Sequence, residues 1–542
     1  MNEDLDGLDE QEEAEACRAI IYRLLSSPNP GRADVDRVKK TVSKKLHLRR
    51  MPKNAAILAH ATEEERKRLR PLLRVKSTRT LSGVTVVAVM TGPLPCPGKC
   101  VFCPGVESQP GAKVAKSYTG REPAAMRSIA HGYDPRRQVA ARLRDLEAIG
   151  HVANKIELIV MGGTFLAAPA DFRDQFVLGC YEGLLGRRFT DLTAAQGEAE
   201  VSERSLVGLT FETRPDYCAA SHVDEMLRFG GTRVEIGAQT VYDDVYEAVC
   251  RGHDLAATKA AIKVAKDAGL KVNLHVMPNL PGSSLLRDEE MFQTLFDDPA
   301  FRPDMLKIYP TLVVEGTRLH ELWARGEYRP YSLDEVVDLL ARVKSRLPPY
   351  VRVQRVQRDI PADLIVAGVR RSDLRNLVKR RMEELGLRCG CIRCREQGFL
   401  ARERRERPFD PHSAPLSVLE YEASGGVEYF LSYEFVPGGP LLGYLRLRLP
   451  SNSAHRPELV ARCAIVREIR VVGVMVAPSE EPSAKQIQHR GLGSKLLAAA
   501  EELAFQELDL DKLLVISGVG VRRWFFNRGY ERDGAYVSKS RS

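Results

Sequence analysis

Cys96, Cys100 and Cys103 stand within ten residues, CPGKCVFCPG, with the spacing C-x3-C-x2-C. Thiolates are soft ligands that suit zinc, Cu(I) or iron–sulfur clusters. An ordinary cluster of four irons takes four cysteines. Three on one loop, with no fourth nearby, leave one iron open to a substrate or cofactor. The alternative is a zinc knuckle or three reduced thiols, although zinc sites usually show paired C-x2-C spacings.

A second cluster, CGCIRC, places Cys389, Cys391 and Cys394 within six residues. This spacing indicates either a metal site that takes a fourth ligand from elsewhere or unmetallated thiols. The remaining cysteines are isolated, and we expect them to be packing residues. They are Cys17, Cys180, Cys218, Cys250 and Cys463.

Two glycine-bearing segments follow expected strands. Gly162 and Gly163 lie in MGGTF, and QHRGLG (488–493) opens the helical pattern 494–505. Backbone N–H groups at a helix N-terminus form an anion site that suits a pyrophosphate. A plain turn before a helix is the alternative for both segments.

The elements that must position these residues alternate between strand and helix. Strands separated by helices favour a complete or partial β/α barrel, whose active residues lie at the C-terminal strand ends. The expected strands are 84–90, 155–165, 205–213, 232–239, 269–278 and 304–314, and the helices include 136–150, 221–230 and 254–269. Beyond about 389 the strands are shorter, at 426–435, 441–450, 464–476 and 513–520.

Charge is unevenly distributed over the 542 residues, whose net charge is +9. Residues 36–80 hold fifteen Lys and Arg against four Asp and Glu, and residues 370–407 hold thirteen against six. Two basic belts beside a cysteine site favour a polyanion partner over solvated helical faces. The acidic first fifteen residues predict a solvated tail. With no signal peptide and no apolar run long enough for a membrane, we expect a reducing, cytoplasmic location.

The C-x3-C-x2-C loop after the first barrel strand resembles the radical S-adenosylmethionine (SAM) superfamily. The resemblance implies a 4Fe–4S cluster on Cys96, Cys100 and Cys103, with SAM on the open iron and an external electron donor. The radical formed from SAM is then a 5′-deoxyadenosyl radical. Gly162 and Gly163 resemble the superfamily's glycine motif, which contacts the amino group of SAM.

The order of strand 464–476, QHRGLG, helix and LLVISGVGVRRWFFNRGY resembles a GCN5-related acetyltransferase (α+β) domain. The pairing of this domain with a partial β/α radical SAM barrel resembles the Elongator catalytic-subunit family, with its single-chain archaeal and bacterial relatives. Further motifs that carry this resemblance include SYTGREP, GLTFETRPDYC, TRVEIGAQ, RGHD, LKIYPTL and GVEYFLSYE. It predicts an acidic tail (1–20), a basic tRNA-binding region (21–80), a radical SAM domain (81–385), a zinc-binding linker (386–415) and an acetyltransferase domain (416–542).

The family resemblance implies an enzyme that builds a carboxymethyl-type group at C5 of the wobble uridine of tRNA from acetyl-CoA. It implies zinc on Cys389, Cys391 and Cys394, with His412 or His275 as candidate fourth ligands, and Lys155 reaching acetyl-CoA from the barrel side. The remaining acetyl-CoA contacts that it implies are Glu468, Ile469, Arg470, Val471, Gln488, His489, Arg490, Gly491 and Phe525. In the first basic belt, we expect Lys44, Lys45, Arg49 and Arg50 to bind tRNA.

The chain departs from the family at two positions. Phe525 stands where the family has a tyrosine, so a proton for the leaving thiol has to come from Tyr530, Tyr536 or water. Asn279 replaces an acid.

Two other functions compete with this prediction: a protein lysine acetyltransferase that uses only the C-terminal domain, and a tRNA-binding scaffold with a structural cluster. The first leaves the cysteine loop and both basic belts unused, and the second predicts a fourth cysteine near the loop.

Overall fold

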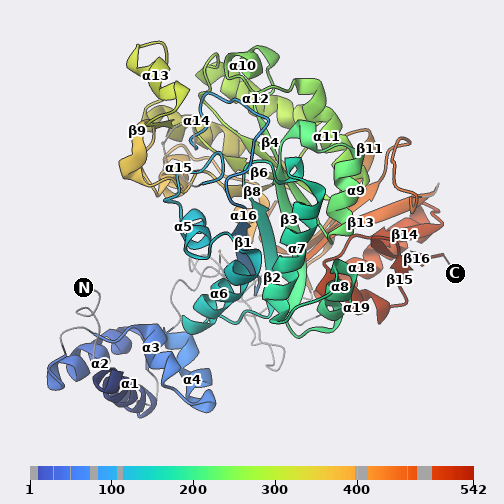
Figure 1. Ribbon diagram of the computed structural model, residues 1–542. Coiled ribbons are helices and arrows are strands. Elements are labelled where there is room, and N and C mark those ends of the chain that lie inside the picture. Colours follow the sequence, from blue (N-terminus) through green and yellow to red (C-terminus); the bar gives the residue numbers. More distant parts are fainter. Residues whose placement is uncertain are drawn as a thin grey trace. The chain divides into compact units, whose positions relative to one another are not determined.

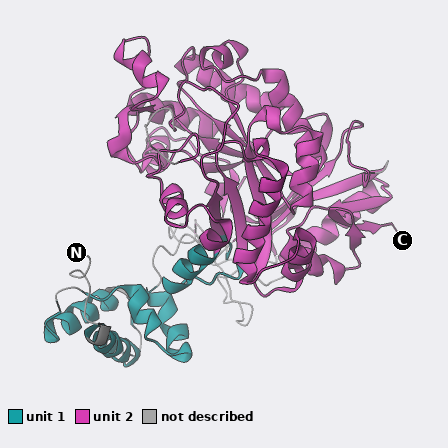
Figure 2. Cartoon of the chain, viewed as in Figure 1, with its two compact units in different colours: residues 1–85, 140–155 teal, residues 86–139, 156–542 magenta. Residues whose placement is uncertain are grey.

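The computed structural model describes residues 10–541 except 28–29, 49–50, 74–82, 106–113, 397–399, 401–412, 437, 460–461 and 473–490. The chain divides into two compact units (Figure 2). One comprises residues 1–85 and 140–155, and the other comprises residues 86–139 and 156–542. The second unit therefore holds most of the expected barrel together with the linker and the C-terminal domain. Residues 140–155, which we expected within the barrel domain, group with the first unit.

The first unit is built around four helices: α1 (Glu10–Leu25), α2 (Arg32–Lys45), α3 (Asn54–Ala59) and α4 (Glu63–Leu73). Ala16, Ile20 and Leu24 recur at four-residue spacing on α1 and are fully buried in the core that these helices share. This apolar stripe makes the acidic segment helical from Glu10 onward, inside the stretch 1–20 that we expected to be a tail.

The barrel is an open sheet of seven strands in the order β1-β2-β3-β4-β5-β6-β8 (Figure 1), and the strand pairs from β3 to β8 are parallel. The strands are β1 (Thr85–Met90), β2 (Lys155–Met161), β3 (Ser205–Thr213), β4 (Arg233–Gln239), β5 (Lys271–Val276), β6 (Met305–Ile308) and β8 (Arg352–Arg355). Since β1 and β8 form the two edges of the sheet, the expected partial β/α barrel is confirmed. The sequence pattern did not predict β8, which has only four residues.

Helices connect the strands, as a parallel sheet requires. They are α5 (Pro123–Ala130), α6 (Pro135–Ala148), α7 (Ala170–Leu185), α8 (Leu192–Val201), α9 (Ala220–Arg228), α10 (Asp243–Ala248), α11 (Leu255–Asp267), α12 (Leu285–Asp297), α13 (Arg318–Ala324), α14 (Leu333–Ser345) and α15 (Leu374–Glu384). Local sequence fixes several of their starts. The Asp254 carboxylate accepts the Ala257 N–H at 2.8 Å before α11, and Ser332 and Glu335 form a capping box at α14. A small antiparallel pair, β7 (Val313–Val314) and β9 (Ile365–Ala367), lies outside the main sheet.

The C-terminal domain has a second seven-stranded sheet, ordered β10-β11-β12-β13-β14-β16-β15. Its elements are β10 (Leu416–Ala423), β11 (Gly426–Glu434), β12 (Leu441–Leu449), β13 (Cys463–Val471), α18 (Leu492–Glu502), β14 (Lys512–Val515), α19 (Arg522–Phe526), β15 (Glu531–Asp533) and β16 (Tyr536–Ser540). β13 and β14 are parallel and pair from Cys463 to Val466, along the whole length of β14, while β13 continues to Val471. The last residues of β13 therefore extend past the end of β14.

The barrel and the C-terminal domain share a charged interior within the second unit. Arg446, Arg448 and Arg467 on β12 and β13 are completely buried. Arg467 pairs with Asp304 at 2.5 Å, and Arg448 pairs with Asp267 at 2.6 Å. Removing one partner of such a pair strands a buried charge, which costs about 3–5 kcal/mol.

Two glycines of VISGVGVR bring a C-terminal loop against β3. A Cβ on Gly518 would lie 2.4 Å from the Val207 backbone, and one on Gly520 would lie 2.5 Å from the Leu206 nitrogen. Only glycine allows this backbone-to-backbone approach. Among the helices of the described residues, none is long and apolar enough to cross a membrane.

Candidate radical SAM site

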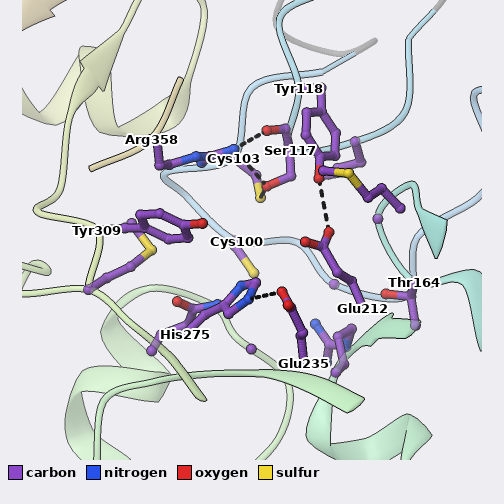
Figure 3. A pocket seen from close by; sticks show the side chains of 18 of the residues that line it. Cys100, Cys103, Ser117, Tyr118, Thr164, Glu212, Glu235, His275, Tyr309 and Arg358 are labelled. Carbon is purple, nitrogen blue, oxygen red and sulfur yellow. Dashed lines mark hydrogen bonds and ion pairs between the residues drawn. The ribbon is translucent and has the colours of Figure 1, made fainter. Parts of the chain in front are cut away.

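The cysteine loop follows β1 and is fixed by backbone hydrogen bonds on both sides. The Val101 N–H donates to the Val249 carbonyl at 3.1 Å, and the Leu319 N–H donates to the Val101 carbonyl at 2.9 Å. Cys96, Cys100 and Cys103 all line one pocket at the C-terminal ends of the barrel strands (Figure 3). This is the end at which a β/α barrel places its active residues.

Two arginines set the charge around Cys100. Arg251, from the RGHD segment, is buried and donates to the Cys100 Sγ at 3.3 Å and to the Gly237 carbonyl at 2.5 Å. A hydrogen bond from Cys103, together with the charges of Arg251 and Arg214, lowers the pKa of the Cys100 thiol to about 5. The loop therefore favours a thiolate, which is the form that binds metal.

The other two cysteines have polar neighbours. The Cys96 Sγ lies 3.7 Å from the Thr164 hydroxyl, and the Cys103 Sγ lies 3.7 Å from the Ser117 hydroxyl. Arg358 donates to the carbonyl of Ser117 and, at 3.4 Å, to its hydroxyl (Figure 3). Three cysteines on one wall of an open pocket fit a 4Fe–4S cluster that takes three protein ligands.

The glycine pair occupies the position that the motif predicts. Gly163 lines the same pocket as the cysteines. Gly162 has φ +135°, and a Cβ there would lie 1.9 Å from the Thr91 hydroxyl. The backbone after β2 can therefore pass this close to Thr91 only with glycine at this position.

A polar cluster lies deeper in the barrel, on the four neighbouring strands β3 to β6. Glu235 accepts from the His275 Nε2 at 2.8 Å and pairs with Lys307, and Glu212 accepts from the Tyr118 hydroxyl at 3.0 Å (Figure 3). Burial alone would raise the pKa of Glu235, but Lys307, His275 and Arg233 hold it well below its usual range.

The oxygens of Glu212 and Glu235 and a nitrogen of His275 lie within 4.8 Å of one another, close enough for a single metal ion. Lys307, however, contacts both glutamates, Glu212 at 3.4 Å. The ammonium already supplies the positive charge there, so these residues form an ion-pair network. In this structure His275 lies with Glu212 and Glu235 and not with the linker cysteines.

The sulfurs of Cys389, Cys391 and Cys394 also lie within 4.8 Å of one another, and Cys391 is fully buried. Hydrogen bonds from Cys389 and Cys394 hold the pKa of Cys391 well below its usual value. A tetrahedral zinc with bonds of about 2.3 Å places its sulfurs about 3.8 Å apart, so the trio fits one ion. His412, the other candidate fourth ligand, lies outside the described residues.

The predicted acetyl-CoA residues lie partly on β13. Glu468 accepts from the Tyr444 hydroxyl at 3.0 Å and from the Arg446 Nε at 2.9 Å, so its carboxylate already has partners. Ile469, Arg470 and Val471 continue the strand, and Gly491 caps α18 with φ +76°. The predicted residues Gln488, His489 and Arg490 lie outside the described residues.

The aromatic residues of this domain are buried. Phe525 is only 4% exposed and packs edge-on against Trp524 and Tyr530. The Tyr530 hydroxyl donates to Glu501 at 2.9 Å, and the Tyr536 hydroxyl donates to the Ala268 carbonyl at 2.9 Å. Burial raises the pKa of both tyrosines, and each hydroxyl already donates a hydrogen bond within the protein.

The two predicted sites lie at opposite ends of the barrel strands. The cysteine loop follows the C-terminal end of β1. β12 and β13 instead contact the strand starts: Arg446 donates to the Tyr350 carbonyl at 2.8 Å, just before β8, and Arg467 donates to the Leu270 carbonyl at 2.7 Å, just before β5. Sequence order alone does not reveal this separation.

The remaining predicted residues are the acetyl-CoA candidate Lys155 and the four tRNA-binding candidates. Lys155 is the first residue of β2, is half-buried, and has its pKa lowered by burial. Lys44 and Lys45 are exposed in the last turn of α2, while Arg49 and Arg50 lie outside the described residues.

Several pocket residues lie in motifs that carried the family resemblance, but no role was predicted for them. Arg251 belongs to RGHD, Glu212 to ETRPDYC, Glu235 to VEIGAQ and Lys307 to LKIYP. Glu212, Glu235 and Lys307 are charged residues within apolar strands. The sequence could have identified them as site residues, because a charged side chain in a barrel interior needs a partner.

Comparisons with known proteins agree with this site. Residues 95–295 match the radical SAM superfamily, residues 303–384 match a radical SAM C-terminal domain, and residues 13–81 match the ELP3 N-terminal domain. A Methanocaldococcus jannaschii tRNA uridine(34) acetyltransferase is 46% identical over 97% of this chain and 98% of its own length. Elongator complex protein 3 of Schizosaccharomyces pombe is 42% identical over 97% and 98%.

A solved structure of archaeal Methanocaldococcus infernus Elp3 with an N-terminal deletion superposes with a TM-score of 0.75. It is 41% identical and covers 85% of this chain and 100% of its own. Together with the cysteine loop at the mouth of the barrel, these matches show that the chain belongs to the tRNA uridine(34) acetyltransferase and Elongator protein 3 family and carries its radical SAM domain.

Proposed function

We propose that the chain modifies the wobble uridine of tRNA by building a carboxymethyl-type group at C5 from acetyl-CoA with radical SAM chemistry. The observation that carries the proposal is the trio Cys96, Cys100 and Cys103 on the wall of an open barrel pocket beside the buried Arg251. It is supported by a relative named tRNA uridine(34) acetyltransferase, similar along almost the whole chain.

In this proposal the three cysteines hold a 4Fe–4S cluster, and the backbone at Gly162 and Gly163 contacts SAM. When bound and reduced by an external donor, the cluster and SAM supply a radical that removes a hydrogen atom from an unactivated C–H bond. Arg251 keeps a positive charge against the Cys100 Sγ, and Arg358 holds the segment at Ser117 beside Cys103.

The charged cluster beneath the cysteines gives the pocket a fixed polar floor. The Tyr118 hydroxyl and the Lys307 ammonium are donors there, and the carboxylates of Glu212 and Glu235 are acceptors. We propose that these groups orient the uracil ring and that the hydrogen bond between the His275 Nε2 and Glu235 fixes the imidazole beside them.

We propose that acetyl-CoA binds the C-terminal domain through β13, the residues from Gln488 to Gly491 and Phe525, with Lys155 contributing from β2. β13 contacts the starts of the barrel strands, so in this proposal the acetyl group has to extend from that end of the barrel toward the cysteine pocket. The experiment therefore scores CoA release and uridine modification separately.

We further propose a structural zinc on Cys389, Cys391 and Cys394, and tRNA contacts on the basic belts that include Lys44, Lys45, Arg49 and Arg50. The close sulfurs of the linker trio and the exposure of Lys44 and Lys45 support these assignments. The electron donor to the cluster is a further partner in this proposal.

The test is to incubate anaerobically reconstituted full-length protein with SAM, acetyl-CoA, a reductant and unmodified tRNA. Nucleoside mass spectrometry then detects a C5-modified uridine, and a thiol assay detects CoA release. We expect the modified nucleoside with wild type and none with Cys100→Ser. Lys155→Ala should lose the modification and keep the fold, and Phe525→Tyr should show whether a tyrosine hydroxyl accelerates CoA release.

Other outcomes separate the competing functions. Acetylation of protein lysines with no change in tRNA would favour a lysine acetyltransferase that uses the C-terminal domain alone. Tight tRNA binding with an intact cluster, but with neither SAM cleavage nor CoA release, would favour a scaffold.

A further inference from the structure

A second groove adjoins the cysteine pocket and is rich in arginine. It encloses about 480 Å³ between the segment before α5, the end of β8, the loop that follows β8, and α15. Asp359 is the one acid among its lining residues in the described part of the chain, against five arginines. These arginines are Arg121, Arg355, Arg358, Arg370 and Arg375.

Three of these guanidinium groups contact backbone carbonyls. Arg370 donates to the Val366 carbonyl at 2.6 Å, Arg375 donates to the carbonyls of Val353 at 3.2 Å and Gln354 at 3.1 Å, and Arg358 donates to that of Ser117. A carbonyl orients a guanidinium but does not neutralise its charge. These contacts therefore hold positive charge in place along the groove.

The other two arginines pair with acids at the surface. Arg121 pairs with Asp363 at 2.5 Å, and Arg355 pairs with Asp359. All four side chains are 41–60% exposed, so each pair contributes little energy and can exchange its carboxylate for another anion at small cost.

The groove leads directly into the cysteine pocket. Arg355, Arg358, Asp359 and Ile360 line both spaces. Arg358 reaches Ser117, whose hydroxyl lies 3.7 Å from the Cys103 Sγ (Figure 3). An extended anion in the groove would therefore end beside the three cysteines.

We propose that this arginine groove binds the phosphodiester backbone of a single RNA strand and delivers the adjoining nucleotide into the cysteine pocket. The proposal rests on the proposed function and deepens it by placing the strand that carries the target uridine. Planar guanidinium groups match phosphate oxygens in pairs, and single-stranded RNA is bound by positive grooves that track its backbone. A base splayed out of an RNA loop is the form that the cysteine pocket can accept.

Contacts to phosphates carry no sequence information, so we expect the groove to bind RNA strands of different sequence with similar affinity. They also distinguish the groove from the exposed lysines of α2, which belong to the other compact unit. Arg370 and Arg375 come from the second basic belt, so the groove gives part of that belt a defined ligand.

The test uses full-length protein without added SAM and measures binding of an RNA hairpin with a uridine in its loop over a salt series. We expect Arg370→Glu/Arg375→Glu to weaken binding at least about tenfold. The slope of log affinity against log salt should fall by about 1.4, since each single-strand phosphate contact contributes about 0.7. Arg325→Glu/Arg329→Glu is the matched control, because it makes the same charge change at exposed arginines outside the groove.

Arg370→Ala provides a milder variant, since Arg370 is exposed. It should lower the slope by about 0.7 while leaving the melting temperature unchanged. Hairpin affinity and slope equal to those of the control variant would overturn the proposal. Loss of acetyl-CoA binding with unchanged hairpin binding would also overturn it and assign the groove to the phosphates of CoA. Groove-dependent hairpin binding without any modified uridine would instead leave the groove assignment standing and refute the proposed function.

Discussion

The two cysteine trios of this chain have similar sequences and different geometries. In the linker, the sulfurs of Cys389, Cys391 and Cys394 all lie within 4.8 Å of one another, whereas those of Cys96, Cys100 and Cys103 do not come together that closely. The linker separation suits one tetrahedral ion, and the wider loop suits a multi-iron cluster.

The two trios also differ in how far their surroundings are open to solvent. The loop trio faces an open pocket that also contains Glu235 and His275. The linker trio is packed into the protein: the Ile392 N–H donates to the Val351 carbonyl at 2.9 Å, and both Cys391 and Ile392 are fully buried. An open metal site can bind a reactant, while a closed one can only hold the fold together, so the comparison assigns chemistry to the first trio and stability to the second.

The largest effect is expected from Cys100→Ser. Without this thiolate the loop should fail to hold iron after anaerobic reconstitution, and uridine modification should be lost. Iron and acid-labile sulfide assays measure the loading, and zinc content should remain at the wild-type level. A variant that kept a full cluster and cleaved SAM would show that Cys100 is not a ligand.

Cys391→Ser should affect the zinc content and leave the iron content unchanged. Zinc should be lost and iron retained, and the melting temperature should fall by about 5 °C or more, because a structural zinc contributes folding energy. Elemental analysis and calorimetry provide the two measurements. Cys463→Ser, a substitution at a buried cysteine outside both trios, is the control. A melting temperature that falls no further than in the control would mean that the linker trio does not stabilise the fold.

Arg251→Met tests whether charge beside the loop trio acts on the cluster. The reduced cluster carries one more negative charge than the oxidised cluster, so removing the guanidinium should make reduction harder. We expect the ratio of reduced to oxidised cluster at a fixed potential to fall at least tenfold, which is about 59 mV for one electron. Electron paramagnetic resonance during a redox titration measures it.

Arg251→Lys is the matched control, because it keeps the positive charge and loses the paired donation to the Cys100 Sγ and the Gly237 carbonyl. A midpoint potential in Arg251→Met equal to that of wild type would contradict the electrostatic role.

The smallest effect is expected at Lys344, a buried lysine whose charge adds to the hydrogen bonds of Cys389 and Cys394 in lowering the pKa of Cys391. Three thiolates and one zinc carry a net negative charge, which the ammonium offsets. Lys344→Met should weaken zinc binding by about tenfold, as substitutions around metal ligands do. Competition with a chelator measures this affinity. Lys344→Arg should preserve it, and equal affinities in both variants would show that the charge does not matter.

Local pattern predicted the elements that carry the chemistry. The strand over 205–213 coincides with β3, and the helix expected over 254–269 contains α11. Hydrophobic periodicity, helix caps and flanking glycines each depend on a few neighbouring residues, so they can be recognised in the sequence. β8 was missed because its four residues, RVQR, include only one apolar residue.

The sequence by itself determined the cysteine spacing, most of the order of strands and helices, and the family. These depend on residue type and near neighbours. The tertiary structure decided which charged residues meet the cysteines, that His275 belongs to the barrel interior, and that β13 contacts the opposite end of the barrel from the cysteine loop. Arg251 is 151 positions from Cys100, and Arg467 is 163 from Asp304. Contacts over such separations form only when the whole sheet closes around them, and no local pattern records which partner each buried charge will find.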